Sequence, residues 1–165
     1  MNKTYFKDKV IIITGASSGI GLASARLFGS CGAKVVMAAR HLDKLQAEVP
    51  SVSADPDNVL CVKTDVSKEE DCKVLINKAV EKFGRIDILV NNAGISMRAM
   101  FKDLDLSVIK SLMDVNFWGT VYCTKYALPY LLHSKGSVVG VISIAGYSAL
   151  PARTGYSSSK YAIRG

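Results

Sequence analysis

The sequence lacks the features that mark membrane, secreted and metal-binding proteins. No apolar run among its 165 residues is long enough to span a membrane; the longest uncharged stretches, Val10–Ala25 and Gly136–Ala152, are interrupted by Gly and Ser. A membrane-spanning helix needs about 18 or more apolar residues. The apolar run Val10–Ile13 is too short for a signal-peptide core. The 4 cysteines include no CxxC pair, which argues against disulfides and metal. We therefore expect a cytoplasmic protein with no membrane partner and no metal.

The charge is unbalanced toward the basic side. Lys and Arg number 21 against 14 Asp and Glu, for a formal net charge of +7. Such a surplus suits nucleic acid, an anionic membrane surface or a phosphorylated ligand. The basic residues are scattered singly, without interleaved aromatics, which favours an ordinary solvated surface over a nucleic-acid-binding patch. We expect no nucleic-acid partner and a single domain over residues 1–165, with no internal repeat.

Short β-branched apolar runs alternate with helical patterns. The runs are continuous, as expected of strands covered on both faces. They lie at Val10–Ile13, Val35–Ala39, Val59–Val62, Ile86–Val90 and Val138–Ile144. This alternation predicts an α/β fold, a doubly wound parallel sheet of the Rossmann type. Such sheets typically have about six or more strands, so the five runs predict that C-terminal strands are missing.

Three segments between the apolar runs carry their own signals. Ser67 and Glu70 have capping-box spacing and predict a helix that starts at Ser67 and ends at Gly84. The stretch from about Ser107 to Leu132 is apolar on several sides and predicts a long buried helix. The segment Val49–Asn58 contains two prolines and predicts a loop.

A glycine-rich turn, TGASSGIG, follows the first predicted strand and opens a helix. Gly15 permits a tight turn, Gly19 lets the backbone approach a pyrophosphate, and Gly21 lets the helix pack on the sheet. The helix N-terminus offers free N–H groups and the positive end of a dipole. The GxxxGxG spacing in this context predicts a nucleotide site, and the plainer alternative is a turn without a ligand.

The end of the second predicted strand indicates which nucleotide is bound. A site for NAD usually has an acidic residue there to bind the ribose 2′-hydroxyl. This chain has Arg40 and His41, and no carboxylate before Asp43. The guanidinium suits a 2′-phosphate, and Ser17 can add a hydroxyl bond. We predict NADP(H) rather than NAD(H); a solvated surface arginine is the alternative.

Polar residues also end the third and fourth predicted strands. Asp65 can accept a hydrogen bond from an adenine amino group or cap the helix that follows, and the sequence leaves both open. The motif Asn91-Asn92-Ala93-Gly94 is expected both to hold turn backbone and to face the ligand. His41 and His133 have no partner pattern and are expected on the surface.

Tyr156 and Lys160 stand at i and i+4, on one face of the last predicted helix. A free phenol holds its proton too tightly to act as a base at neutral pH, but an ammonium about 4 Å away favours the phenolate by about 1–4 kcal/mol. The pair can therefore exchange protons near neutrality, although this spacing also occurs on plain helix surfaces. Ser143, at the predicted end of the fifth strand, can hold a substrate carbonyl. No GxSxG motif supports a serine hydrolase.

Together these motifs resemble the short-chain dehydrogenase/reductase family, over nearly the whole chain. The residues that carry the resemblance are TGASSGIG, NNAG, Asn116, Ser143 and YSSSK, in that order. The resemblance implies that Tyr156 is the general acid/base and that Ser143 orients the substrate oxygen. It implies that Lys160 assists the tyrosine and bonds the nicotinamide ribose, and that Asn116 holds a water of the proton relay.

The resemblance also implies a hydride transfer between NADP(H) and a carbonyl or alcohol substrate. The predicted cofactor contacts are Gly15, Ser17, Ser18, Gly19, Ile20, Gly21, Arg40, Asp65, Asn92, Ala93, Gly94, Tyr156 and Lys160. It implies homo-dimers or homo-tetramers packed through the helices around Asn116–Leu132 and Tyr156. Family members continue with further strands and a substrate loop, so the fifth strand is expected to be an exposed apolar edge. The alternative function is a truncated, non-catalytic dinucleotide-binding domain or interaction fragment.

Overall fold

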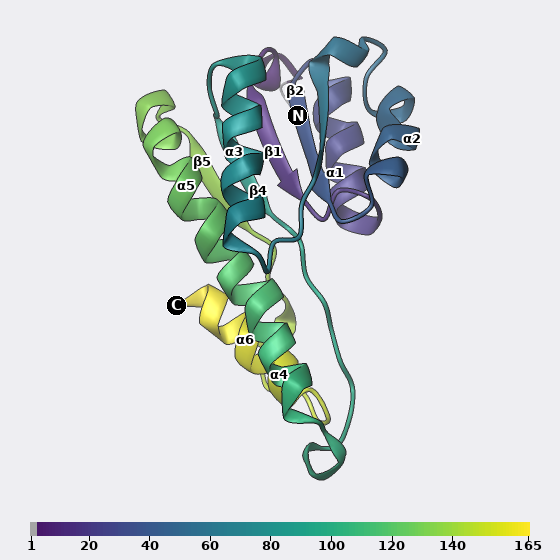
Figure 1. The fold of residues 1–165 in the computed structure, drawn as a ribbon, viewed down its shortest axis with the longest axis vertical. Helices are drawn as coiled ribbons and strands as arrows, with labels where there is room; N and C mark the ends of the chain where they lie inside the picture. Colours follow the sequence, from purple (N-terminus) through teal and green to yellow (C-terminus); the bar gives the residue numbers. More distant parts are fainter. Residues whose placement is uncertain (1–2) are drawn as a thin grey trace.

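The computed structural model describes residues 3–165 and shows one sheet with helices on both faces (Figure 1). Residues 1 and 2 of the predicted domain lie outside the described residues. The sheet has five strands in the order β3-β2-β1-β4-β5, and all neighbours are parallel. The strands are β1 Val10–Thr14, β2 Lys34–Ala39, β3 Val59–Lys63, β4 Ile88–Asn91 and β5 Ser137–Gly140. The predicted α/β doubly wound fold is confirmed.

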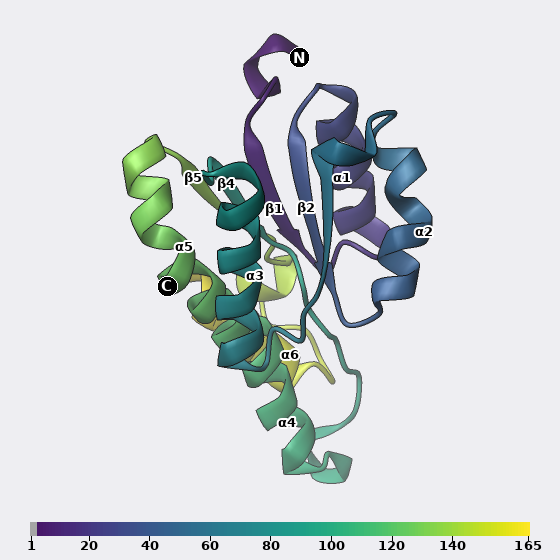
Figure 2. The ribbon, with the colours of Figure 1, turned by 45° about the horizontal axis from the view of Figure 1, so that its top comes forward.

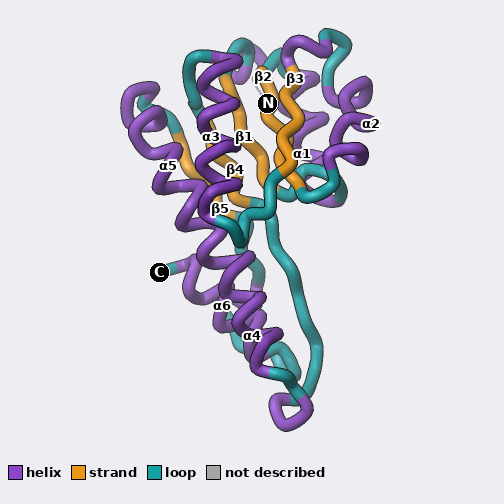
Figure 3. Tube along the Cα trace, viewed as in Figure 1, coloured by secondary structure: helices purple, strands orange, loops and turns teal. Residues whose placement is uncertain are grey.

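Six α-helices connect and extend the strands. They are α1 Gly19–Ser30, α2 Leu42–Val52, α3 Glu69–Phe83, α4 Leu106–Leu112, α5 Gly119–Ser134 and α6 Thr154–Arg164. Figure 2 shows α1 and α2 on one side of the sheet and α3 and α5 on the other. In Figure 3 a long loop runs from β4 away from the sheet to α4, so that α4 and α6 lie beyond the ends of the strands.

Alternate side chains of β1 enter two different cores. Ile12 belongs to the core that contains Leu75 of α3, whereas Ile11 belongs to the core that contains Leu45 of α2. Side chains of a strand alternate between faces, so a strand covered on both sides must be apolar throughout. All five residues of β1 are buried, which is why its sequence shows no alternation.

The strand order places a binding edge at the centre of the sheet. From β1 the chain adds β2 and β3 on one side, and then β4 and β5 on the other. In open α/β sheets, ligands bind at the carboxyl ends of the strands where this reversal occurs. Here that point lies between β1 and β4, which are paired through Ile13 and Val90 near their carboxyl ends.

The predicted capping box is wrong, although the helix itself is present. Helix α3 begins at Glu69, and Lys68 occupies its N-cap. The Ser67 hydroxyl instead donates to Asp65 Oδ1 at 2.7 Å, within a turn that precedes the helix. Three acidic residues in the first turn of α3 face the positive end of its dipole. Gly84 ends the helix in the left-handed conformation, with φ 75°, as predicted.

The predicted loop Val49–Asn58 is wrong in its first part. Helix α2 continues to Val52 with Pro50 inside its last turn. Tertiary contacts outweigh the proline there, because the Val52 side chain is buried in the core. Arg26 of α1 also donates to Ser51 at 3.0 Å. The remainder holds a short 3₁₀ turn, Pro56–Asn58.

The long helix predicted from about Ser107 to Leu132 is present over that stretch. It is neither regular throughout nor buried on all sides. Residues 113–118, between α4 and α5, form a π-helical segment. Leu128 and Leu132 of α5 are exposed. The fifth strand is shorter than the predicted Val138–Ile144, and all four of its residues are exposed, which confirms the expected open edge.

Candidate active site

The turn between β1 and α1 packs directly on the segment that follows β4. Gly15 has φ +66°, and a Cβ added there would lie 2.9 Å from the Ala93 Cα. A Cβ on Gly21 would lie 2.5 Å from Asn92 Nδ2. Any larger residue would push the two loops apart, so the glycines at these positions bring the ends of β1 and β4 together.

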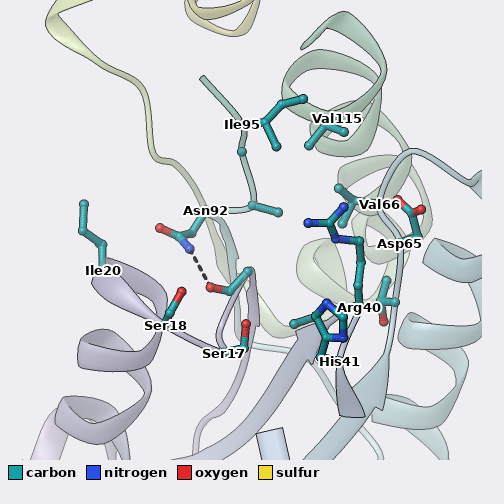
Figure 4. A pocket seen from close by; sticks show the side chains of 15 residues that line it. Ser17, Ser18, Ile20, Arg40, His41, Asp65, Val66, Asn92, Ile95 and Val115 are labelled. Carbon is teal, nitrogen blue, oxygen red and sulfur yellow. Dashed lines mark hydrogen bonds between the residues drawn. The ribbon is translucent and has the colours of Figure 1, made fainter. Parts of the chain in front are cut away.

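Hydrogen bonds lock the same two loops. The Thr14 hydroxyl oxygen accepts the N–H groups of Asn92 and Ala93, each at 3.0 Å. Asn92 Nδ2 donates to the carbonyl oxygens of Thr14 at 2.9 Å and Gly15 at 3.3 Å. The view of Figure 4 shows the Asn92 side chain turned toward the glycine turn. The predicted role of the Asn motif in holding turn backbone is confirmed.

A cavity of about 350 Å³ lies over the carboxyl ends of these strands. Its lining residues are Gly15, Ser17, Ser18, Ile20, Ala39, Arg40, His41, Thr64, Asp65, Val66, Asn92, Ala93, Gly94, Ile95 and Val115. Of the predicted cofactor contacts, Gly19, Gly21, Tyr156 and Lys160 are outside this lining. Six lining residues were not among the predicted contacts: Ala39, His41, Thr64, Val66, Ile95 and Val115. All but Val115 are adjacent in sequence to Arg40, Asp65 or the NNAG motif, a signal that could have found them.

The beginning of α1 leaves backbone donors without partners. Ser18 is the N-cap residue, but its side chain makes no capping hydrogen bond, and the first turn holds no acidic residue. Gly19 has φ +54°, and a Cβ added there would meet nothing within 4 Å. The open space and the free N–H groups at this helix end form a site suited to an anion.

Arg40 is an exposed cation at the end of β2, and Figure 4 shows it reaching into the cavity. Within residues 3–165 its guanidinium has no ion pair; the carboxylates that form ion pairs are Glu48, Glu70 and Asp87. His41 beside it is exposed, as predicted, and lines the same cavity. The arrangement leaves one planar, unpaired cation free to bind a ligand in the cavity.

Asp65 organises the turn between β3 and α3. Its Oδ1 accepts the Ser67 N–H at 3.2 Å and the Ser67 hydroxyl at 2.7 Å. Its own N–H donates to Asp71 Oδ2 at 2.9 Å. The carboxylate therefore caps a turn before the helix and also lines the cavity.

Lys160 connects α6 with the cavity wall. Its Nζ lies 5.8 Å from the centroid of the Tyr156 ring and donates to the Val141 carbonyl at 3.0 Å. A Cβ on Gly94 would lie 3.4 Å from the same Nζ. Burial lowers the pKa of Lys160 below its ordinary value of 10.5. The ammonium thus lies close to both the phenol ring and the NNAG motif.

Asn116 is fully buried within the π-helical segment. Its Oδ1 accepts the Ile95 N–H at 2.8 Å, and its Nδ2 donates to the Ile95 carbonyl at 3.0 Å and to Ser159 Oγ at 2.9 Å. Its backbone carbonyl accepts the Thr120 hydroxyl at 2.8 Å. Single-turn π segments often mark functional sites, and this one turns a polar side chain toward the cavity wall.

The sequence predicted Ser143 at the end of the fifth strand, but it lies beyond the end of β5. The strand stops at Gly140, and Ser143 precedes the short 3₁₀ turn Ile144–Gly146. The Ser143 hydroxyl oxygen accepts the Ala145 N–H at 3.2 Å. A Cβ on Gly146 would lie 2.9 Å from the Lys160 carbonyl oxygen, so this turn packs against α6.

The family profile described as short chain dehydrogenase matches residues 9–165. The chain belongs to the short-chain dehydrogenase family. The fold is therefore an oxidoreductase fold of the NAD(P)-binding Rossmann type.

Curated and solved relatives support the family membership. The chain is 44% identical over 158 residues to 11-beta-hydroxysteroid dehydrogenase A of Sesamum indicum, covering 94% of this chain and 45% of the relative. An alcohol dehydrogenase from Thermococcus sibiricus, complexed with 5-hydroxy-NADP, has a TM-score of 0.92 and 31% identity, covering 96% of this chain and 68% of that one. A short-chain dehydrogenase/reductase from Burkholderia phymatum in complex with NAD has a TM-score of 0.91 and 31% identity, covering 96% of this chain and 57% of that one.

The chain spans about half the length of the curated relatives it matches.

None of the helices within residues 3–165 is long and apolar enough to cross a membrane. In the same part of the chain no cluster of His, Cys, Asp or Glu could hold a metal ion. All four cysteines are free thiols. A hydrogen bond with Cys72 and burial raise the pKa of Cys123.

Proposed function

We propose that this short-chain dehydrogenase transfers a hydride between NADP(H) and a carbonyl or alcohol substrate, with Tyr156 as the general acid/base. The unpaired guanidinium of Arg40 in the cavity is the observation that carries the NADP(H) preference. Solved relatives include both a 5-hydroxy-NADP complex and an NAD complex, so the preference rests on this chain's own residues.

The lining of the cavity supports a phosphorylated dinucleotide as its ligand. We place the pyrophosphate at the N-terminus of α1, where Gly19 leaves space and the N–H groups are free. Arg40 and Ser17 would hold the 2′-phosphate, and Asp65 an adenine amino group. The remaining contacts would come from Ser18, Ile20, Asn92, Ala93 and Gly94. The bound nicotinamide would supply the hydride.

The four predicted catalytic residues, Asn116, Ser143, Tyr156 and Lys160, would supply and remove the proton. The Tyr156 hydroxyl would donate to the substrate oxygen during reduction and accept the proton during oxidation. The Lys160 ammonium, 5.8 Å from the ring centroid, stabilises the negative charge that then develops on the phenol oxygen. Ser143 would orient the substrate oxygen, and Asn116 would hold a water on the path by which protons reach Lys160.

The exposed face of β5 favours a second candidate function. All four residues of β5 are exposed, which suits an interaction surface, and the cavity by itself suits a dinucleotide-binding domain without turnover. We also propose homo-dimers or homo-tetramers through α5 and α6: Trp118 stacks on Tyr122 at the start of α5, and Leu128 and Leu132 are exposed farther along the same helix.

Turnover distinguishes the two functions. The intact chain is incubated with NADPH and a panel of ketones, and NADPH oxidation is followed by absorbance. The enzyme proposal predicts turnover that falls about 1,000-fold or more in Tyr156→Phe, because the proton donor is lost. Tyr161→Phe is the matched control in the same helix. NADPH binding with no turnover in the unmodified chain would instead support the binding domain.

A further inference from the structure

Ser159 joins the helix of the proton-transferring pair to the buried Asn116. It lies in α6 between Tyr156 and Lys160 and has no exposed surface. Its hydroxyl donates to the Tyr156 carbonyl at 2.8 Å and its oxygen accepts the Asn116 Nδ2 at 2.9 Å. One buried hydroxyl thus satisfies two groups that are far apart in the sequence.

The connection continues to the wall of the dinucleotide cavity. The Asn116 carboxamide bonds both backbone groups of Ile95, at 2.8 and 3.0 Å, and Ile95 lines the cavity. Ile95 also directly follows Gly94, where an added Cβ would lie 3.4 Å from the Lys160 Nζ. An unbroken series of hydrogen bonds therefore runs from the cavity wall through the π-helical segment to α6.

The neighbouring serines show that this contact is specific. Ser157 is buried, but its hydroxyl has no partner. Ser158 is exposed, and its hydroxyl donates to the Thr154 carbonyl at 2.9 Å within its own helix. Among these three consecutive serines, Ser159 alone reaches Asn116.

We propose that Ser159 is a positioning residue, which fixes α6, and with it Tyr156 and Lys160, against Asn116 and Ile95. The proposal rests on the proposed function for its effect on turnover. Without the hydroxyl, one Nδ2 hydrogen of Asn116 has no partner in a fully buried site, and the carboxamide no longer holds Ile95 firmly. The reacting groups then lose their fixed distance from the cavity, which slows the chemical step more than it weakens binding.

The test compares Ser159→Ala with Ser158→Ala and Ser157→Ala, which remove hydroxyls that do not touch Asn116. Amide hydrogen exchange at Ile95, whose N–H donates to Asn116 Oδ1, is measured by NMR without any need for turnover. We expect exchange to be about three- to tenfold faster in Ser159→Ala, because one buried hydrogen bond is lost. The two controls should stay within twofold of the unmodified chain.

The kinetic measurement uses the same variants with NADPH and a ketone that the unmodified chain reduces. In Ser159→Ala we expect kcat to fall about tenfold or more with KM within about twofold, and Ser159→Thr, which keeps the hydroxyl, to recover most of the loss. Equal Ile95 exchange in Ser159→Ala and Ser158→Ala would overturn the proposal. A rise in KM in Ser159→Ala with an unchanged kcat would also overturn it. Absence of turnover in the unmodified chain would contradict the proposed function, while the exchange result would still decide the role of Ser159.

Discussion

At the scale of one residue, the proposed preference for NADP(H) rests on Arg40. We expect Arg40→Ala to weaken NADPH binding by about 10- to 100-fold, because a charge-assisted bond to the 2′-phosphate is lost. NADH lacks that phosphate, so its affinity should change less than about twofold. The measurement is a fluorescence titration with each dinucleotide.

Lys44→Ala is the matched control, because it removes a positive charge from an exposed site in the neighbouring helix α2, outside the cavity lining. It should leave both affinities within about twofold, as expected for a screened surface charge. If Arg40→Ala weakens NADPH and NADH equally, the arginine does not read the 2′-phosphate.

Lys160 makes the stability of the fold depend on pH. Burial lowers its pKa in the folded chain below the ordinary 10.5, so the folded state binds this proton less tightly than the unfolded state does. The cost to folding is fully present below the folded pKa and disappears as the pH rises toward 10.5. The unmodified chain should therefore gain stability relative to Lys160→Met as the pH rises.

Urea unfolding of both chains from neutral pH to the ordinary pKa of lysine measures this difference. Titration of all other groups cancels in the comparison, provided that they do not interact with Lys160. A difference in unfolding free energy that is constant with pH, or that falls, would show that the lysine keeps its ordinary proton affinity.

At the level of elements, the packing of α1 on the loop after β4 depends on Gly21. A Cβ there would lie 2.5 Å from Asn92 Nδ2, so we expect Gly21→Ala to reduce the free energy of unfolding by about 1–3 kcal/mol. Ser18→Ala is the control, because the Ser18 side chain makes no capping bond and its loss should cost less than about 0.5 kcal/mol.

Both values come from denaturant unfolding followed by circular dichroism. A Gly21→Ala chain as stable as the unmodified one would mean that α1 can move away from Asn92. If Ser18→Ala reduced the free energy of unfolding by about 1 kcal/mol, as the loss of an ordinary N-cap serine does, Ser18 would be a cap of α1.

Several elements followed from local patterns, and others depended on contacts that the sequence does not display. The continuous apolar runs predicted the strands, since residues buried on both faces must be apolar. The capping box at Ser67 failed because the Asp65 carboxylate takes the serine hydroxyl. Pro50 stays within α2 because Val52 is anchored in the core.

The site was predictable wherever a residue stands at a strand end. Gly15 and Arg40 were found in this way, since the carboxyl ends of parallel strands meet at one edge. Asn116 has no such signal. Its place depends on a π-helical segment and on the bonds with Ile95, and a resemblance to relatives was needed to single it out.

For the molecule as a whole, the open edge of the sheet predicts aggregation. Val138 and Val139 of β5 are 45% and 44% exposed on a strand with one unpaired side. Exposed apolar edge strands pair with other chains, and a charged residue on the edge opposes this. We expect Val139→Lys to reduce concentration-dependent aggregation, measured by light scattering.

Val74→Lys is the control, because it adds the same charge at an exposed valine of α3, away from the edge. If both variants reduce scattering equally, net charge rather than the β5 edge governs association.

We propose above that the cavity at the ends of β1, β2, β3 and β4 binds NADP(H). The most direct measurement is a titration of the intact chain with NADPH and, separately, with NADH, followed by NMR of the backbone amides. We expect saturable binding that shifts the amides of Gly15, Arg40 and Gly94, with NADPH bound at least about tenfold more tightly than NADH. Absence of saturable binding, or equal affinity for the two dinucleotides, would contradict it.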